Sequence, residues 1–399
     1  MLKIVLHKSD APSYRAAVLQ LPEQENTLAE KLEQIGVGIT TEKNCLVDQV
    51  EGDGGALQRL VGQCVNADEL QFLAKRLDSF DQHELLAFRA AVTVEELTEV
   101  ENMINLTFNL HAYTVIADFS DVSRIGRTHL MTMRGGMPAD EMERTDFEKA
   151  GRQLIADGAA IVTPYGVLYE NGTEQELVYN GRQFPEYFYK SCFAEVTLSP
   201  DETFSATEHL YLPCWDVEIQ KALNRLGVTD PSRCHAKLEL EQPDILEGGR
   251  FPSKIINLFT RDFPLAEHLD TLNALCRSYQ GFDDQALDNF NAIIEWAEPR
   301  TPEELKILAD NYFEITVIPG IHSDEEYGRH MIMESSHYDF DPELEDYIDF
   351  DGYGGDRVRR EKGDFTPYGY LAYTGASPEM EEILSRRDEP GMELGGMQV

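Results

Sequence analysis

Basic residues are scarce in this sequence, and the shortage limits what the protein can bind. The 399 residues include 34 Lys and Arg but 73 Asp and Glu, which gives a formal net charge of −39. A surface of this charge repels phosphate groups and anionic lipids, so we expect no direct binding to nucleic acid or to a membrane. It attracts basic partners instead, and the DNA-binding cleft of another protein is a partner of that kind.

The acidic surplus is uneven along the chain. Residues 1–190 hold 30 acidic and 17 basic side chains, whereas residues 191–399 hold 43 and 17. General adaptation to high salt is the alternative explanation, but it would spread the acids evenly. The distribution therefore favours a binding surface in the second half of the chain.

The sequence also lacks paired cysteines and long apolar runs. Its six cysteines are scattered without a CxxC pair, which indicates reduced thiols and no disulfide framework or zinc site. No apolar run approaches the ~18 residues of a membrane span, and the N-terminus shows no signal peptide. With 42% hydrophobic residues, we expect a globular, cytoplasmic protein of two or more domains.

Motifs for catalysis and for nucleotide binding are missing as well. The GxxxxGK[ST], GxGxxG, GxSxG and HExxH patterns do not occur. A calcium loop starting at Asp339 would have Leu344 in place of the required Gly and Phe350 in place of Glu. We therefore expect that the protein is not an enzyme and needs no cofactor.

One group of side chains leaves a metal-dependent enzyme open as an alternative. His330, Glu334 and His337 would share one face of a helix and could hold a metal ion together with Glu326. The favoured interpretation is simpler, because histidines beside surface acids commonly do no more than pair with them. No metal site is therefore predicted.

Similar segments recur in the same order along the chain. Residues 18–37 match 209–228, and residues 69–92 match 271–294. Three closing motifs of the first half, IGR (125–127), FEKAG (147–151) and TPYGVLY (163–169), match YGR (327–329), FDGYG (350–354) and TPYGYLAY (366–373) in the second. Three ordered repeats predict a tandem duplication. The paired apolar stripes of the 69–92 and 271–294 segments are typical of a helical hairpin.

The predicted fold is therefore α+β, with two homologous modules that each combine small mixed sheets with a helical hairpin. At the N-terminus, strands are expected over residues 2–6 and 16–21 and a helix over roughly 25–35. The predicted parts are a first module at 1–178, a packed aromatic bridge at 179–192, a second module at 193–376 and a frayed tail at 377–399.

The densest charge lies in the stretch His337–Gly354, which contains no Lys or Arg. Asp341-Pro342 is typical of a helix start, and Gly352 would end that helix. Leu344, Tyr347 and Ile348 would then face inward. The aromatic residues of this region are expected in the core and in strands, with interface anchors as the alternative; they are Tyr347, Phe350, Tyr353, Tyr368 and Tyr370.

The candidate partner-binding residues are carboxylates. The main set, which we call the acidic segment, is Asp339, Asp341, Glu343, Glu345, Asp346, Asp349 and Asp351. A second set extends it and consists of Asp283, Asp284, Asp288, Glu303, Glu304, Asp324, Glu325 and Glu326. The nearby Arg329 is expected to form an internal ion pair.

This region resembles the ArdA-like antirestriction proteins of mobile genetic elements. The resemblance rests on LEDYIDFDGYGGDRVRREKGDFTPYGYLAY (344–373), EEYGRHMIMESS (325–336) and PEELKILADN (302–311). The first module is similar to that family mainly through the second. Gly355 stands where the family favours Arg, which puts any contact made by that Arg in doubt.

The resemblance implies an elongated acidic DNA mimic that occupies the DNA-binding cleft of a type I restriction-modification enzyme. The part of the enzyme that it would bind is the core formed by the methyltransferase and specificity subunits. Family members are usually short chains that form dimers, so this longer chain resembles a fused double-length form. A monomeric pseudo-dimer and a homodimer are both open. An acidic adaptor for another basic DNA-processing or defence protein is the alternative function.

Overall fold

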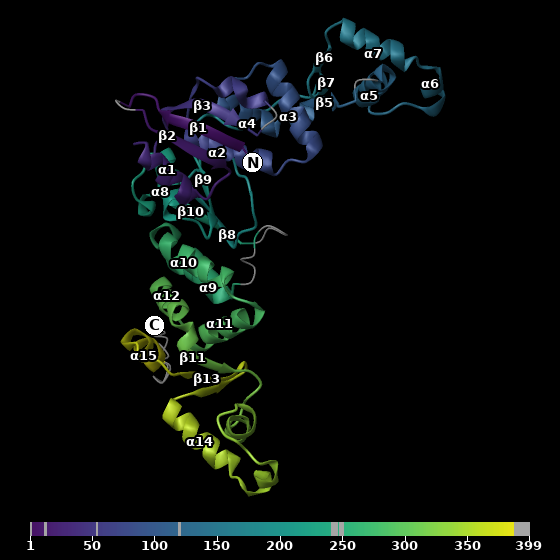
Figure 1. The fold of residues 1–399 in the computed structure, drawn as a ribbon. Coiled ribbons are helices and arrows are strands. Elements are labelled where there is room, and N and C mark those ends of the chain that lie inside the picture. The colour runs from purple at the N-terminus through teal and green to yellow at the C-terminus, as the bar shows by residue number, and fades with distance from the viewer. Residues whose placement is uncertain are drawn as a thin grey trace, which may run out of the picture. The chain divides into compact units, whose positions relative to one another are not determined.

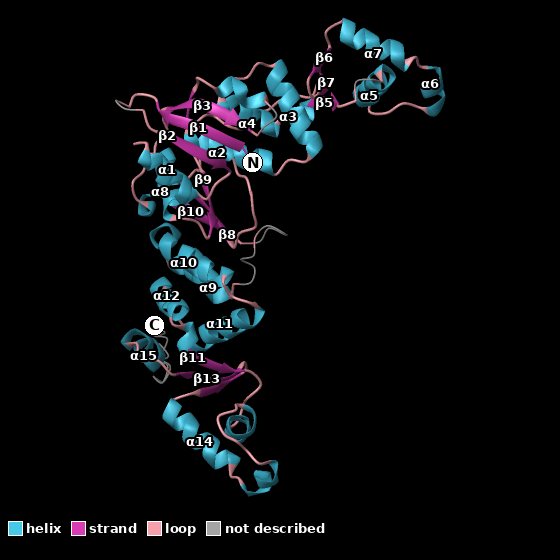
Figure 2. Cartoon of the chain, in the orientation of Figure 1, coloured by secondary structure: helices cyan, strands magenta, loops and turns pink. Residues whose placement is uncertain are grey.

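The computed structural model describes residues 2–11, 14–52, 55–118, 121–240, 246 and 251–386 (Figure 1). The fold is mixed, as predicted, with many helices and several small sheets (Figure 2). The chain divides into two compact units. The first comprises Met1–Ser191, Thr197–Leu210 and Cys214–His235, and the second comprises Cys192–Val196, Tyr211–Pro213 and Ala236–Val399.

The N-terminal sheet has the strand order β2-β1-β3-β4, and its paired strands are antiparallel. Its strands are β1 Leu2–Lys8, β2 Ala16–Leu21, β3 Cys45–Glu51 and β4 Cys64–Val65. Alternate residues of β1 and β2 are buried, because successive side chains of a strand point to opposite faces. Both predicted strands are confirmed, and so is the predicted helix, α1 Glu25–Gln34.

Helices and a three-stranded sheet complete the first half of the chain. The helical elements are η1 Ala56–Leu60, α2 Ala67–Asp78, α3 Gln82–Val94, α4 Val100–Phe108, η2 Leu110–Ala112, α5 Val122–Arg134, α6 Ala139–Arg144 and α7 Phe147–Ala156. The sheet has the order β5-β7-β6 and consists of β5 Tyr113–Ile116, β6 Ala160–Thr163 and β7 Gly166–Glu170. Residues 69–92, predicted as a helical hairpin, do form two consecutive helices, α2 and α3, but α2 packs mainly against α4 and not against α3.

The second half repeats this order of elements. Its strands are β8 Ala194–Ser199, β9 Glu208–Leu212, β10 His235–Glu239, β11 Ile315–Ile318, β12 Asp364–Thr366 and β13 Gly369–Tyr373, in sheets of order β10-β8-β9 and β11-β13-β12. Its longer helices are α8 Asp216–Leu226, α10 Leu269–Gln280, α11 Asp284–Ala297, α12 Pro302–Asp310, α14 Phe350–Glu361 and α15 Pro378–Ser385. Its shorter elements are η3 Pro231–Arg233, α9 Ser253–Asn257, η5 Leu258–Asp262, η6 Leu265–His268, η7 Tyr312–Glu314, α13 Asp324–Arg329, η8 His330–Glu334 and η9 Pro342–Tyr347.

Several details match between the halves. Asp81 and Asp283 cap α3 and α11, each accepting a hydrogen bond from the backbone N–H three residues later at 2.8 Å. Gly166 and Gly369 begin equivalent strands with positive φ values of 131° and 119°. These details support the duplication, which stays a prediction because the compact units do not follow its boundaries. The start of the predicted tail is helical, whereas residues 387–399 lie outside the described residues.

The predicted aromatic bridge is packed. The ring of Phe184 stacks on Phe72 of α2 with a centroid distance of 4.7 Å, and on Tyr179 at 5.2 Å. The Tyr179 hydroxyl donates a hydrogen bond to Glu69 Oε1 at 3.1 Å. These contacts place the bridge within the first unit and against α2.

A buried charge network attaches α8 to the first unit. Lys221 Nζ lies 2.8 Å from Glu25 Oε2 and 2.7 Å from Asp68 Oδ1, and its side chain is only 6% exposed. Arg225 continues the network with Glu208 at 2.8 Å. Burial lowers the pKa of Lys221, but the adjacent carboxylates outweigh it and the net shift is upward. Burial likewise opposes the ionisation of Glu25, yet its two lysine partners hold its pKa at about 2.

We predict that Lys221→Met destabilises the first unit by roughly 3 kcal/mol, because removing one partner of a buried ion pair leaves carboxylates without compensation. Chemical denaturation measures the change. Lys306→Met is the matched control, since its pair with Asp310 is about half exposed and contributes well under ~1 kcal/mol. Equal losses in the two variants would contradict a stabilising role for the buried network.

Candidate functional site

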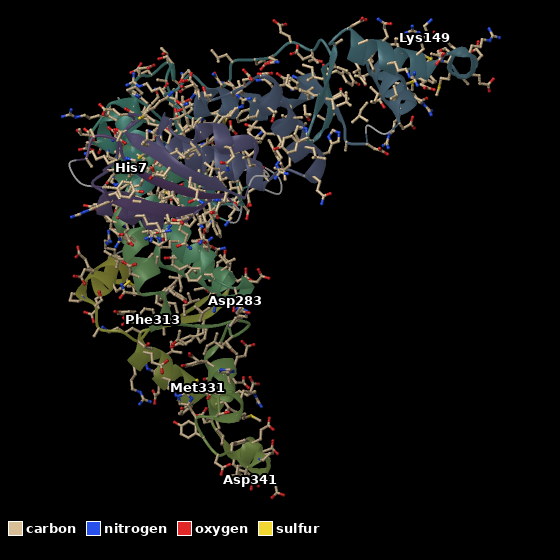
Figure 3. The ribbon with its side chains drawn as sticks, turned by 45° about the horizontal axis from the view of Figure 1, so that its top comes forward. His7, Lys149, Asp283, Phe313, Met331 and Asp341 are labelled. Atoms are coloured by element: carbon tan, nitrogen blue, oxygen red, sulfur yellow. The ribbon has the colours of Figure 1, made fainter. Side chains whose placement is uncertain are left out.

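The acidic segment lies between two helices of the second unit. It follows α13 and the π-helical turn η8, and it leads into α14. In Figure 3 Asp341 lies at a tip of this unit, beyond Met331 as seen from Phe313. The segment is therefore placed by the way in which α13 and α14 pack together.

The helix predicted across this segment is only partly correct. Asp341 does begin a helical turn, since its Oδ1 accepts a hydrogen bond from the Glu343 N–H at 3.0 Å. That turn is the short 3₁₀ helix η9, which ends at Tyr347. Asp349 then caps a new helix, α14, by accepting from the Gly352 N–H at 2.9 Å. Gly352 thus lies in the first turn of a helix and does not end one, because the second capping residue, Asp349, begins a new helix.

The side-chain directions differ from the prediction as well. Leu344 is 51% exposed and Tyr347 is 86% exposed, so neither faces the core. Phe350 and Tyr370 are buried as expected, whereas Tyr368 is about half exposed. On the single helix predicted here, Glu345 and Asp349 would lie one turn apart. They lie instead in separate elements, because the helix is interrupted at Ile348.

Two glycines set the contact between α13 and α14. A Cβ atom on Gly328 would collide with the carbonyl oxygen of Phe350, and one on Gly354 would collide with that of Asp324. The two backbones are therefore closer than any side chain permits. Gly126 and Gly151 make the equivalent contact between α5 and α7. The glycines of the repeated IGR/YGR and FEKAG/FDGYG motifs carried this information in the sequence, but the contact was not predicted.

Gly355 of α14 also lies at the contact with α13. A Cβ atom at this position would lie 3.1 Å from Asp324 Oδ2, tighter than ordinary van der Waals contact. Gly355 is also buried. A side chain at this position would require the Asp324 carboxylate to shift slightly.

A polar network fixes the other end of α14. Glu361 accepts hydrogen bonds from the hydroxyl groups of Tyr327 and Tyr370, both at 2.7 Å, and from Arg357 Nε at 2.8 Å. The Tyr327 and Tyr370 rings stack with centroids 4.1 Å apart. Burial raises the pKa of Glu361, but these three donors outweigh it and the net shift is downward. No pattern in the sequence indicated this network, because its four residues are far apart along the chain or have no shared motif.

The fifteen candidate carboxylates differ in how far they are neutralised. Arg329 forms the predicted ion pair with Glu345 and lies 4.6 Å from the Phe350 ring centroid. Glu303 pairs with His268 at 2.9 Å and Glu304 with Arg386 at 2.8 Å. Five exposed carboxylates form no side-chain ion pair or hydrogen bond with another described residue. They are Asp288, Asp339, Glu343, Asp346 and Asp351.

The other candidates have local roles in the backbone. Asp283, Asp341 and Asp349 cap helices, and Glu326 accepts a hydrogen bond from the His322 N–H at 2.7 Å. Glu325 lies 3.9 Å from Arg329. Asp324 is half-buried under Gly355, and Asp284 is exposed at the start of α11. The positions of most of these carboxylates are therefore tied to the fold.

The metal ligands considered from the sequence do not converge. His330 Nδ1 lies 3.0 Å from Glu334 Oε2, whereas His337 Nδ1 lies 3.2 Å from the Ser335 hydroxyl. Within the residues that the structure describes, His330, Glu334 and His337 do not form a three-ligand group. The metal-dependent alternative therefore loses the ligand set on which it was based.

Compared with protein-family models and with curated protein sequences, the chain matches none. Of the described helices, none is long and apolar enough to cross a membrane.

We predict that Gly328→Ala destabilises the second unit by roughly 2 kcal/mol, because the new methyl group forces α13 and α14 apart. Hydrogen exchange should show faster exchange of α14 amides as well as lower global stability. Gly281→Ala is the control, since a Cβ atom there meets only the Ser278 carbonyl oxygen at 3.5 Å. Unchanged protection of α14 in Gly328→Ala would contradict the close contact.

A second prediction concerns pH. Because the folded-state pKa of Glu361 is lowered, its contribution to stability is present above the unfolded value, about 4.3, and is lost as pH falls below it. Glu361→Gln removes this contribution at neutral pH. The variant should therefore lose less stability than the wild type between pH 5 and pH 3, measured by thermal unfolding. Glu343→Gln, at an exposed position, should keep the wild-type slope.

Proposed function

We propose that this protein is a DNA mimic that occupies the DNA-binding cleft of a basic partner, and that the partner is a type I restriction-modification enzyme. The observation that carries the proposal is the state of the acidic segment. Asp339, Glu343, Asp346 and Asp351 are exposed without a counterion among the described residues, on a segment held at both ends by helices. The motif resemblance of residues 302–373 names the target class.

Electrostatics explains why this arrangement favours binding. Carboxylates on an ordered segment keep their spacing, so they lose less conformational entropy on binding than a flexible acidic tail does. A field of one sign steers a Lys- and Arg-lined cleft towards it and raises the association rate. The partly neutralised residues Glu303, Glu304 and Glu345 contribute less, because a partner would have to compete with their internal ion pairs.

The central prediction is competition with DNA. Labelled duplex bound to a purified type I methyltransferase core is titrated with this protein at several salt concentrations. We expect near-stoichiometric displacement at low salt, and the protein's own affinity for the core should fall as salt rises, because screening reduces the attraction between opposite charges. Displacement is followed by fluorescence anisotropy.

Charge-reversed variants identify the surface. Reversal to Lys of Asp339, Glu343, Asp346 and Asp351 together should abolish displacement without unfolding the protein, since these side chains have no described partner. The control reverses four exposed acids of the first unit, Asp10, Asp140, Glu143 and Glu174, and changes net charge equally. Full displacement by the first variant would refute the assignment of the acidic segment. Failure of the wild-type protein to displace DNA would refute the target.

A further inference from the structure

The acidic segment carries exposed apolar side chains as well as charge. Tyr347, at 86% exposure, and Leu344, at 51%, belong to the single turn η9 Pro342–Tyr347. That turn also holds three of the seven carboxylates of the segment, Glu343, Glu345 and Asp346. Apolar and acidic groups are therefore presented together by one short element.

Tyr347 differs from the aromatic residues around it. The Tyr338 and Tyr353 hydroxyl groups lie 3.0 Å apart, and Arg329 covers the Phe350 ring. Tyr347, in contrast, has no ring contact and no side-chain hydrogen bond with another described residue. Its ring contributes nothing evident to the packing of the second unit. Apolar groups that are exposed together and surrounded by polar residues are commonly found at interaction sites, whereas single exposed apolar residues are ordinary.

We propose that Tyr347 and Leu344 are apolar anchors that enter a pocket of the basic cleft which the acidic segment occupies. This inference rests on the proposed function. Charge complementarity selects the occupant, because a partner that covers these two side chains must also meet the surrounding carboxylates and must therefore be basic. Tyr is one of the residues that most often dominate binding energy at interfaces, when a pocket surrounds it and excludes water.

The anchors would distinguish the protein from the DNA that it replaces. DNA binding depends strongly on phosphate contacts, and affinity falls steeply as salt concentration rises. Burial of an apolar side chain involves no ion pair and is not screened in this way. The protein should therefore keep part of its affinity at salt concentrations that release DNA from the same cleft.

The two contributions can be separated experimentally. The dissociation constant of the full-length protein for a purified type I methyltransferase core is measured at three or more salt concentrations. Tyr347→Ala combined with Leu344→Ala should weaken binding by roughly tenfold at every salt concentration. The slope of affinity against salt should stay as in the wild type. Tyr347→Phe keeps the ring and should bind almost normally.

Phe313→Ala is the matched control. Phe313 is also a highly exposed aromatic residue of the second unit, at 71%, and it lies in η7, away from the acidic segment (Figure 3). Its replacement should leave the dissociation constant unchanged. Thermal unfolding of each variant confirms that the fold is intact, as expected for substitutions at exposed positions.

Each outcome decides the question. Wild-type affinity in the double variant would overturn the anchors while leaving DNA mimicry in place. A changed salt slope would also overturn them, because the substitutions would then act by displacing carboxylates. If the wild-type protein does not bind the core at any salt concentration, the proposed function fails, and the anchor proposal fails with it.

Discussion

The close contact of α13 and α14 is the constraint on which the acidic surface depends. Gly328 and Gly354 allow the two backbones to touch, and the residues between the helices must then form a short connection outside that contact. Glu361 holds the far end of α14 through three hydrogen bonds. The carboxylates of the segment therefore occupy positions set by backbone packing, although few of them take part in it.

Sequence patterns predicted the regular parts of the fold better than the candidate site. Strands β1 and β2 and helices α1, α2 and α3 follow from apolar periodicity because each has a core to pack against. Leu344, Tyr347 and Ile348 have helical periodicity too, but Leu344 and Tyr347 are exposed and Ile348 is only partly buried. With little burial to favour one long helix, two Asp caps in succession decided the local structure. Periodicity indicates which residues can share a face, and packing decides whether that face is buried.

Equivalent helix pairs in the two halves carry different electrostatics. Around α5 and α7, Arg134 pairs with Glu141 and Arg152 with Glu148, both at 2.5 Å, so acids and bases largely balance. Around α13 and α14, Arg329 pairs closely with Glu345, and the other carboxylates of the acidic segment form no ion pair with a described residue. Two helix pairs with the same kind of glycine contact therefore carry surfaces of different charge, balanced around α5 and α7 and acidic around α13 and α14. This contrast supports the second half as the site of partner binding.

The buried network around Lys221 has a consequence for biosynthesis. Glu25 and Asp68 leave the ribosome about 150 to 200 residues before Lys221 does, a delay of roughly 8 to 40 s at 5–20 residues per second. During that interval the nascent first unit lacks α8 and the Lys221 ammonium group, and of its two lysine partners Glu25 has only Lys75. Its final structure is therefore completed late, after a segment from the second half of the chain has been translated. Emerging chains with this order of contacts are typical clients for chaperones that shield incompletely packed surfaces.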